Sequence, residues 1–182
     1  MEDIVKQAMA KWPNVPDCYG WLGLDARGDW YLRDAQAQAC GTFASGRPGA
    51  KGARLRHEAL LAFIARNYEA DARGFWFFQN GPQRVFVELE VAPWVWRVDD
   101  AGQVQAHTGQ SATRHEVLSD ESGRVFLRTD LGFGLVHTQD VARVAELMDD
   151  ARWQPDSVAA ATLPQRFGYV LSPQHQRTKK PA

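Results

Sequence analysis

Two glutamates two positions apart are the clearest candidates for acid–base chemistry in this 182-residue sequence. Glu88 and Glu90 stand in the segment RVFVELEV, where apolar residues alternate with other types. Successive side chains of a strand point to opposite faces, so we expect both carboxylates on one solvated face, within the range that paired-acid hydrolases use. A solvated face balanced by Arg84 or Arg97 gives the same pattern, and ion pairs also perturb carboxylates. We favour this second interpretation.

Three histidines form the second group that could do chemistry. His107, His115 and His137 fall in segments that strand pairing could bring together, with Glu116 and Asp140 as further ligands. Imidazole and carboxylate groups bind zinc, but the spacing matches neither HExxH nor a pair one helical turn apart. We therefore expect no metal and no cofactor.

Other catalytic motifs are missing from the sequence. No serine lies in G-x-S-x-G, and neither Cys18 nor Cys40 has a histidine close to it in the sequence. The glycine-bearing segments 46–52 and 131–134 match neither GxGxxG nor GxxxxGK[ST], so we interpret them as turns. The sequence names no catalytic residue.

A tryptophan-rich segment is the candidate binding surface. Trp94 and Trp96 follow Pro93 and share one strand face, and Trp76 and Phe78 lie on the strand before them. Large rings are usually mostly buried, which favours a place in the core. If the face is open, it offers a patch to a ligand or a protein partner. The candidate ligand-binding residues are therefore Trp94, Trp96, Glu88, Glu90 and Arg97.

The elements that position these residues are predicted to be mainly strands. Residues 74–99 form the densest aromatic and β-branched block, and proline-containing breaks divide it into strand-length pieces. Alternation and turn residues elsewhere predict two hairpins and a last strand. The predicted strands cover 75–78, 85–91 and 94–98, the hairpins cover 19–33 and 124–137, and the last strand covers 166–172.

Helices are predicted over 2–12, 54–70 and 138–149, where apolar residues recur at helical spacing. Segment 35–52 is rich in alanine, glutamine and glycine, and we expect a mobile loop. Amphipathic helices need a sheet against which to bury their apolar stripes, so we predict an α+β fold with a mainly antiparallel sheet. The expected sub-domains cover residues 1–100 and 101–173, followed by a disordered tail at 174–182.

The two halves share an order of elements that suggests an internal repeat. The hairpin at 19–33, the helix at 54–70 and the strand containing Phe75 have counterparts in the hairpin at 124–137, the helix at 138–149 and the strand at 166–172. Helices after hairpins are common, so chance gives the same order, and we leave both explanations open.

Four short motifs resemble an uncharacterised family of bacterial proteins known only as a domain of unknown function. They are a Gly-x-Trp-Tyr strand (28–31), an approximate Arg-x-x-Leu helix start (Arg56 to Leu60), a valine-glutamate strand ending in Ala-Pro-Trp (85–94) and a strand–glycine–helix segment (125–148). The resemblance implies two similar α/β halves and a binding or signalling role. It transfers no catalytic residue.

The composition narrows the classes of function. The chain is 45% hydrophobic and 24% charged, as in ordinary globular proteins, and its formal net charge of -1 argues against general binding to nucleic acid or anionic membranes. We find no signal peptide, no membrane-spanning run and no disulfide-dense pattern, and expect a cytoplasmic protein.

We therefore favour a non-catalytic binding or regulatory module over an enzyme. The expected partner is a small molecule or a protein, with no nucleic acid and no membrane, and formation of a homodimer is left open. The alternative is a small hydrolase or metal-dependent enzyme that uses Glu88 and Glu90, or His107, His115 and His137.

Overall fold

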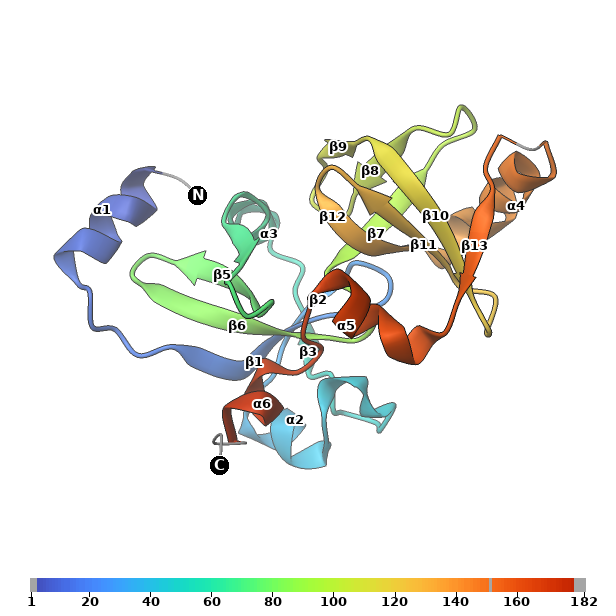
Figure 1. Cartoon of the computed structure of the whole chain (residues 1–182). Helices are drawn as coiled ribbons and strands as arrows, with labels where there is room; N and C mark the ends of the chain where they lie inside the picture. Colours follow the sequence, from blue (N-terminus) through green and yellow to red (C-terminus); the bar gives the residue numbers. More distant parts are fainter. Residues whose placement is uncertain (1–2, 151, 179–182) are drawn as a thin grey trace. The chain divides into compact units, whose positions relative to one another are not determined.

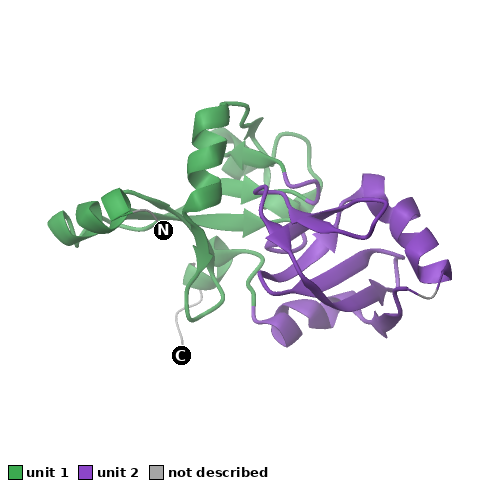
Figure 2. Cartoon of the chain, turned by 90° about the horizontal axis from the view of Figure 1, so that it is seen from above, with its two compact units in different colours: residues 1–25, 29–90, 169–182 green, residues 26–28, 91–168 purple. Residues whose placement is uncertain are grey.

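The computed structural model describes residues 3–150 and 152–178, which form two mainly antiparallel sheets with helices (Figure 1). The predicted α+β class is confirmed. Two compact units share the chain (Figure 2): unit 1 comprises Met1–Asp25, Asp29–Glu90 and Tyr169–Ala182, and unit 2 comprises Ala26–Gly28 and Val91–Gly168. The expected sub-domains 1–100 and 101–173 stay a prediction about which segments fold independently.

Unit 1 is built on a six-stranded sheet with the order β3-β2-β1-β6-β5-β4. The central pair β1/β6 is parallel and the other neighbours are antiparallel. Its strands are β1 (Cys18–Leu24), β2 (Trp30–Leu32), β3 (Ala53–Arg54), β4 (Tyr68–Ala70), β5 (Trp76–Asn80) and β6 (Gln83–Leu89). Its helices are α1 (Asp3–Lys11), α2 (Ala35–Cys40), α3 (Glu58–Arg66), α6 (Pro173–Thr178) and the 3-10 turn η1 (Phe43–Ser45).

Unit 2 is built on a seven-stranded sheet with the order β13-β10-β11-β12-β7-β8-β9. Its strands are β7 (Trp94–Val98), β8 (Val104–Ala106), β9 (Ser111–Ala112), β10 (Arg114–Asp120), β11 (Val125–Thr129), β12 (Gly132–Val136) and β13 (Pro155–Val158). Helix α4 (Val141–Asp149) follows the 3-10 turn η2 (Thr138–Asp140), and α5 (Leu163–Phe167) follows η3 (Ala160–Thr162). Here β7 is parallel to β12, and β10 is parallel to β13.

The two sheets repeat one topology. In each unit two three-stranded antiparallel meanders join through the first strand of one and the last strand of the other, which lie parallel: β1 with β6, and β7 with β12. Two similar halves are therefore confirmed. The equivalent elements differ from the predicted ones, because β1–β6 correspond to β7–β12.

In each meander the first two strands are joined by the same type of hairpin turn, Asp-x-x-Gly. The aspartate carboxylate accepts a hydrogen bond from the backbone N–H four residues later, at 2.8–3.1 Å. The glycine adopts a φ of 73–80°, a left-handed conformation that other residues enter only at a cost. The four turns start at Asp25, Asp71, Asp99 and Asp120.

Three predicted elements need correction. The predicted strand at 166–172 is wrong, since α5 ends at Phe167 and Gly168 takes a left-handed C-cap conformation. The predicted helix at 54–70 is confined to α3, with β3 before it and β4 after it. Of the predicted tail, Gln174–Thr178 lie in α6, and residues 179–182 lie outside the described residues, as does residue 2 of the first predicted helix.

The prediction of a mobile loop at 35–52 is also wrong. The segment contains α2 and η1, and the side chain of a buried arginine is hydrogen-bonded to its backbone. Arg33 is 1% exposed and donates hydrogen bonds to the carbonyl oxygens of Gly20, Gly41 and Ala50 at 2.6–3.3 Å. Phe43, also buried, packs over Gly23, where a Cβ would lie 2.4 Å from its ring. A few large side chains therefore order a segment of low hydrophobicity.

Strand β6 does not have the predicted solvated face. Phe86, Val87, Glu88 and Leu89 are all buried, so both faces are covered. Part of the cover comes from the segment 169–178, here called the C-terminal strap, which belongs to unit 1 although it is far from β6 in the sequence. The Leu89 N–H donates to the Leu171 carbonyl at 2.8 Å, and α6 lies against β6. A cover supplied from so far away leaves no trace in the local alternation.

Candidate ligand-binding pocket

A row of polar side chains crosses three neighbouring strands of unit 2. Arg97 on β7 pairs with Gln105 on β8, which pairs with Ser111 on β9, so these side chains share one face of the sheet. Val98 and Val104 point the other way and are buried. Alternation along the strands thus gives a polar outer face and an apolar inner face.

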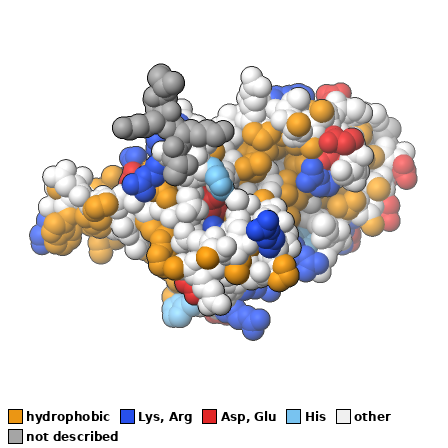
Figure 3. Space-filling view, turned by 90° about the horizontal axis from the view of Figure 1, so that it is seen from below, with side chains coloured by type: hydrophobic (Ala, Val, Ile, Leu, Met, Phe, Trp, Pro, Cys, Tyr) orange, Lys and Arg blue, Asp and Glu red, His pale blue; other side chains and the backbone are white. Residues whose placement is uncertain are grey.

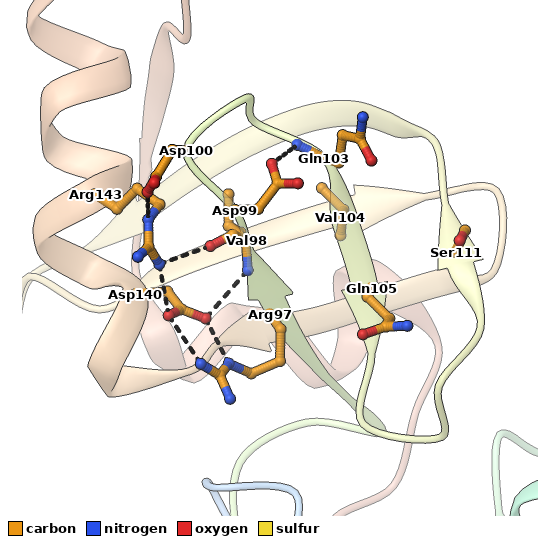
Figure 4. Close-up of a pocket in the computed structure, with 10 residues that line it drawn as sticks. All are labelled: Arg97, Val98, Asp99, Asp100, Gln103, Val104, Gln105, Ser111, Asp140 and Arg143. Atoms are coloured by element: carbon orange, nitrogen blue, oxygen red, sulfur yellow. Dashed lines mark hydrogen bonds and ion pairs between the residues drawn. The ribbon is translucent and has the colours of Figure 1, made fainter.

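Asp140 lies where η2 leads into α4, at one end of this row, and it fixes the side chains of Arg97 and Arg143 (Figure 4). Its carboxylate accepts hydrogen bonds from Arg97 Nε at 2.6 Å and Nη2 at 3.1 Å, and from the Val98 N–H at 3.1 Å. Arg143 Nη1 donates to the same carboxylate and to the Val98 carbonyl, both at 2.9 Å, while its Nε donates to Asp100. One 2%-exposed carboxylate therefore holds two guanidinium groups.

The charges of this cluster stabilise one another. Burial by itself would raise the pKa of Asp140, but the hydrogen bonds from Arg97 and Val98 and the charges of both arginines outweigh it and hold the pKa below its ordinary value. The hydrogen bond to Asp140 raises the pKa of Arg97, and that to Asp100 raises the pKa of Arg143. The cluster stays ionised at neutral pH.

The polar row and the arginine pair line a hollow of about 540 Å³. Arg97 Nη1 and Arg143 Nη2 have no hydrogen-bond partner among residues 3–150 and 152–178. Asp99 also lines the hollow, and its Oδ1 accepts hydrogen bonds from the Ala101 and Gln103 N–H groups of its own turn. The lining contains two arginines and three aspartates, with Gln103, Gln105 and Ser111 as neutral groups. Such a site can bind charges of both signs. Among the described residues that line it there is no histidine to activate Ser111 as a nucleophile.

A family model described as "Protein of unknown function (DUF2946)" matches residues 1–174. The chain belongs to this family. The resemblance to a family of unknown function that the sequence motifs indicated is therefore confirmed. Among curated proteins none matches the chain.

Two solved structures are similar to this member of the DUF2946 family. A DUF1285 family protein from Silicibacter pomeroyi DSS-3 is 14% identical, with a TM-score of 0.49 over 74% of this chain and 73% of that chain. A DUF1285 family protein from Shewanella baltica OS155 is 17% identical, with a TM-score of 0.44 over 70% of this chain and 91% of that chain. Within the described part of the chain, the helices are too short or too polar to cross a membrane.

Of the five candidate residues from the sequence, Arg97 lines the pocket. Trp94 and Trp96 are 5% and 0% exposed and stack on each other with ring centroids 5.7 Å apart. The indole N–H of Trp96 donates to the Leu127 carbonyl at 3.2 Å. Gly134 lets β7 and the Trp96 ring approach β12, since a Cβ there would lie 2.4 Å from the Trp94 carbonyl oxygen and 2.6 Å from Trp96 Nε1. Both tryptophans are therefore part of the core of unit 2.

Glu88 and Glu90 have separate partners. Glu88 accepts hydrogen bonds from the Ser172 hydroxyl at 2.5 Å and the Gln174 N–H at 3.1 Å, whereas Glu90 accepts one from Lys51 Nζ at 2.8 Å. Burial raises the pKa of Glu88, although Ser172, Gln174 and the charge of Arg33 act in the opposite direction. Glu88 fastens the strap and Glu90 fastens Lys51, which is a structural use of both acids.

The three histidines do not converge. His107 Nδ1 accepts a hydrogen bond from the Val95 N–H at 3.3 Å, and His137 Nδ1 accepts one from the Gln139 N–H at 3.1 Å. His115 is exposed on β10. The described residues contain no group of three or more histidine, cysteine, aspartate or glutamate side chains that could hold a metal ion.

Sequence reasoning missed most of the pocket. It considered Asp140 as a metal ligand, but not as the anchor of Arg97 and Arg143. The sequence does contain one pattern that indicates the pocket. Polar residues alternate along the chain before the Asp-x-x-Gly turn at 99–102, at Arg97 and Asp99, and after it, at Gln103 and Gln105. Two strands joined by such a turn place these four side chains on one face.

Proposed function

We propose that the protein is a non-catalytic binding module and that the unit 2 pocket binds a small zwitterion, such as an amino acid. The observation that carries the proposal is the pair of guanidinium groups held on buried Asp140, each with one amino group left unpaired among the described residues. Because Asp140 fixes both arginines before a ligand arrives, little side-chain entropy remains to be lost on binding.

The charge distribution favours a zwitterion over a simple anion. Three aspartates against two arginines would repel a ligand with negative charge alone. Arg97 and Asp99 lie two residues apart on one strand face, roughly 6–7 Å along the strand. A ligand carboxylate on Arg97 Nη1 and a ligand ammonium on Asp99 fit this separation, and Gln103, Gln105 and Ser111 remain for its hydroxyl or amide groups.

A regulatory role, a cytoplasmic location and the absence of nucleic-acid partners belong to the same proposal. They are supported by the near-neutral charge and by the ordinary composition. No observation on the glutamates or histidines favours the alternative enzyme.

The test is a calorimetric titration of the full chain with glycine, β-alanine and γ-aminobutyrate, with acetate and methylamine as single-charge controls. The loss of one charge-assisted hydrogen bond removes about 1.5–3 kcal/mol, so Arg97→Gln should weaken binding about 10- to 100-fold. Asp99→Asn should weaken the zwitterions and leave the weak binding of acetate unchanged.

Arg128→Gln is the matched control variant. Arg128 lies in the same unit, is 51% exposed like Arg97, and is paired with a carboxylate, Glu116, at 2.8 Å. It does not line the pocket. Equal loss of affinity in both variants, or no binding of any zwitterion to the wild-type chain, would contradict the proposal.

A further inference from the structure

A second hollow, of about 560 Å³, lies in unit 1 and has no part in the proposed function. Its lining combines Trp21 of β1 with residues 32–34, at the end of β2, and with α2. The Arg33 N–H donates to the Trp21 carbonyl at 2.9 Å, so these strand ends are neighbours. Gly49 and Gly52 also line the hollow, and because neither has a side chain the space stays open.

Most of the lining is apolar and open to solvent. Among the described residues, four large hydrophobic side chains are exposed, and two of them, Trp21 (47%) and Leu32 (48%), line this hollow. Ala37, Cys40 and Ala53 add further apolar lining. Figure 3 shows unit 1 from the side on which α2 lies, and hydrophobic side chains (orange) are open to solvent there between neutral groups. A ligand with apolar groups can therefore reach these walls.

The Trp21 ring lacks a partner that another exposed tryptophan has. The ammonium group of Lys11 lies 4.6 Å from the ring centroid of Trp12. Within residues 3–150 and 152–178, no cation and no aromatic ring lies against Trp21. Cations are attracted to the face of an aromatic ring, and most strongly to that of tryptophan. Trp21 therefore offers an accessible cation-binding surface inside the hollow.

Among the described lining residues two are charged, and only one of these charges is accessible. Arg33 is 1% exposed, its guanidinium donates to three backbone carbonyl oxygens, and the charge of buried Glu88 acts on it. Asp34 is exposed, and its Oδ1 accepts a hydrogen bond from the Ala37 N–H at 2.8 Å. No cation pairs with Asp34 in the described part of the chain. The accessible charge of the hollow is therefore negative, which favours a cation as ligand.

We propose that this hollow binds a small free organic cation with a quaternary ammonium group, such as choline. The methylated nitrogen lies over the Trp21 indole, its methyl groups contact Leu32 and Ala53, and the Asp34 carboxylate supplies the opposite charge. A quaternary nitrogen has no N–H group, so it enters an apolar hollow without leaving a donor unpaired. A primary ammonium would lose water that this lining does not replace, which favours the methylated cation.

The experiment is a ligand-detected NMR titration of the full chain with choline and with 3,3-dimethylbutan-1-ol, a neutral alcohol of the same shape in which carbon replaces the charged nitrogen. Choline should bind, and the neutral alcohol should bind at least about tenfold more weakly. Ethanolamine, which has the charge but not the methyl groups, should also bind at least about tenfold more weakly.

Two variants test the two groups that contact the cation. Asp34→Asn removes the charge but keeps the cap of α2, because asparagine is as good an N-cap as aspartate, and it should weaken choline about tenfold. Trp21→Leu keeps an apolar wall without the ring and should also weaken choline about tenfold. The matched controls are Asp17→Asn and Trp12→Leu, because both residues are exposed in unit 1 and line a different hollow, and they should leave choline binding unchanged.

No binding of choline, equal binding of choline and the neutral alcohol, or equal effects of Trp21→Leu and Trp12→Leu would overturn the proposal. The comparison of the ligands on the wild-type chain decides even if a variant does not fold. Vesicles of phosphatidylcholine present the same group on a lipid, and competition of these vesicles with choline would overturn the assignment to a free molecule. Choline has no carboxylate for Arg97, so failure of zwitterion binding in unit 2 has no bearing on this outcome.

Discussion

His107 provides a test of how well the structure accounts for acid sensitivity. The residue follows β8, and its imidazole Nδ1 accepts the Val95 N–H while its Nε2 is shielded from solvent. The ring lies beside Trp94 at 5.6 Å, and a Cβ on Gly28 would lie 2.7 Å from His107 Cβ. Burial lowers the pKa of His107 from 6.5 to about 3.

The sign of the effect follows from proton uptake. Between pH 3 and pH 6.5 the unfolded chain binds a proton at this histidine and the native chain does not. Stability contributed by the neutral ring is therefore present above the ordinary pKa and is lost as the pH falls. Each pKa unit corresponds to about 1.4 kcal/mol, and pH 5 lies about 1.5 units below the ordinary value. We expect the native state to lose about 2 kcal/mol from this residue between pH 7 and pH 5.

The assay is urea unfolding of the wild-type chain and of His107→Asn at pH 7 and pH 5. Asparagine offers an oxygen acceptor to the Val95 N–H but does not titrate in this range. The fall in the free energy of unfolding should be about 2 kcal/mol larger for the wild type than for the variant. The same fall in both chains would show that the imidazole is hydrated or charged in the native state, and would refute the reasoning.

Three further substitutions test the packing. Gly134→Ala should cost more than about 2 kcal/mol of unfolding free energy in urea, because its Cβ would lie 2.4 Å from the Trp94 carbonyl oxygen, a rigid backbone atom. Arg33→Met should leave three carbonyls without their donor, cost about 3 kcal/mol or more, and speed proteolysis of the segment that follows. Ser172→Ala should cost about 1–2 kcal/mol at pH 7 and less at pH 4, since protonated Glu88 needs no donor there; an equal cost at both pH values would contradict this.

Local pattern was enough to predict the first helix, the helix at 138–149 and the hairpin at 19–33. In each case the apolar period and the terminating residue agree, as where Pro13 follows α1. Segment 35–52 could not be predicted in this way. Its order depends on Arg33, a charged residue that is usually exposed but here satisfies carbonyl oxygens from three separate places in the sequence.

The pocket could be predicted only in part for a related reason. The alternation around the turn at 99–102 places Arg97 and Gln105 on one face, and this much is local. The contact between Arg97 and Asp140 spans 43 positions and depends on β12 lying parallel to β7. A parallel neighbour is joined by a long connection rather than a tight turn, so nothing near Arg97 in the sequence identifies its partner.

The corresponding parallel pair of unit 1, β1 with β6, explains why the strand containing Glu88 was predicted correctly but the burial of Glu88 was not. In an antiparallel meander, strands that are consecutive in the sequence lie next to each other in the sheet. Each of the four meanders in the described residues contains an Asp-x-x-Gly turn. Where two meanders meet, each of the two parallel central strands has another strand on both sides. Their faces are then covered by segments from elsewhere in the chain. In unit 1 part of that cover is the C-terminal strap, whose Ser172 and Gln174 satisfy Glu88 across more than 80 positions. A glutamate at the junction of two meanders is therefore better judged by asking which distant segment donates to it than by the solvent exposure that its own alternation suggests.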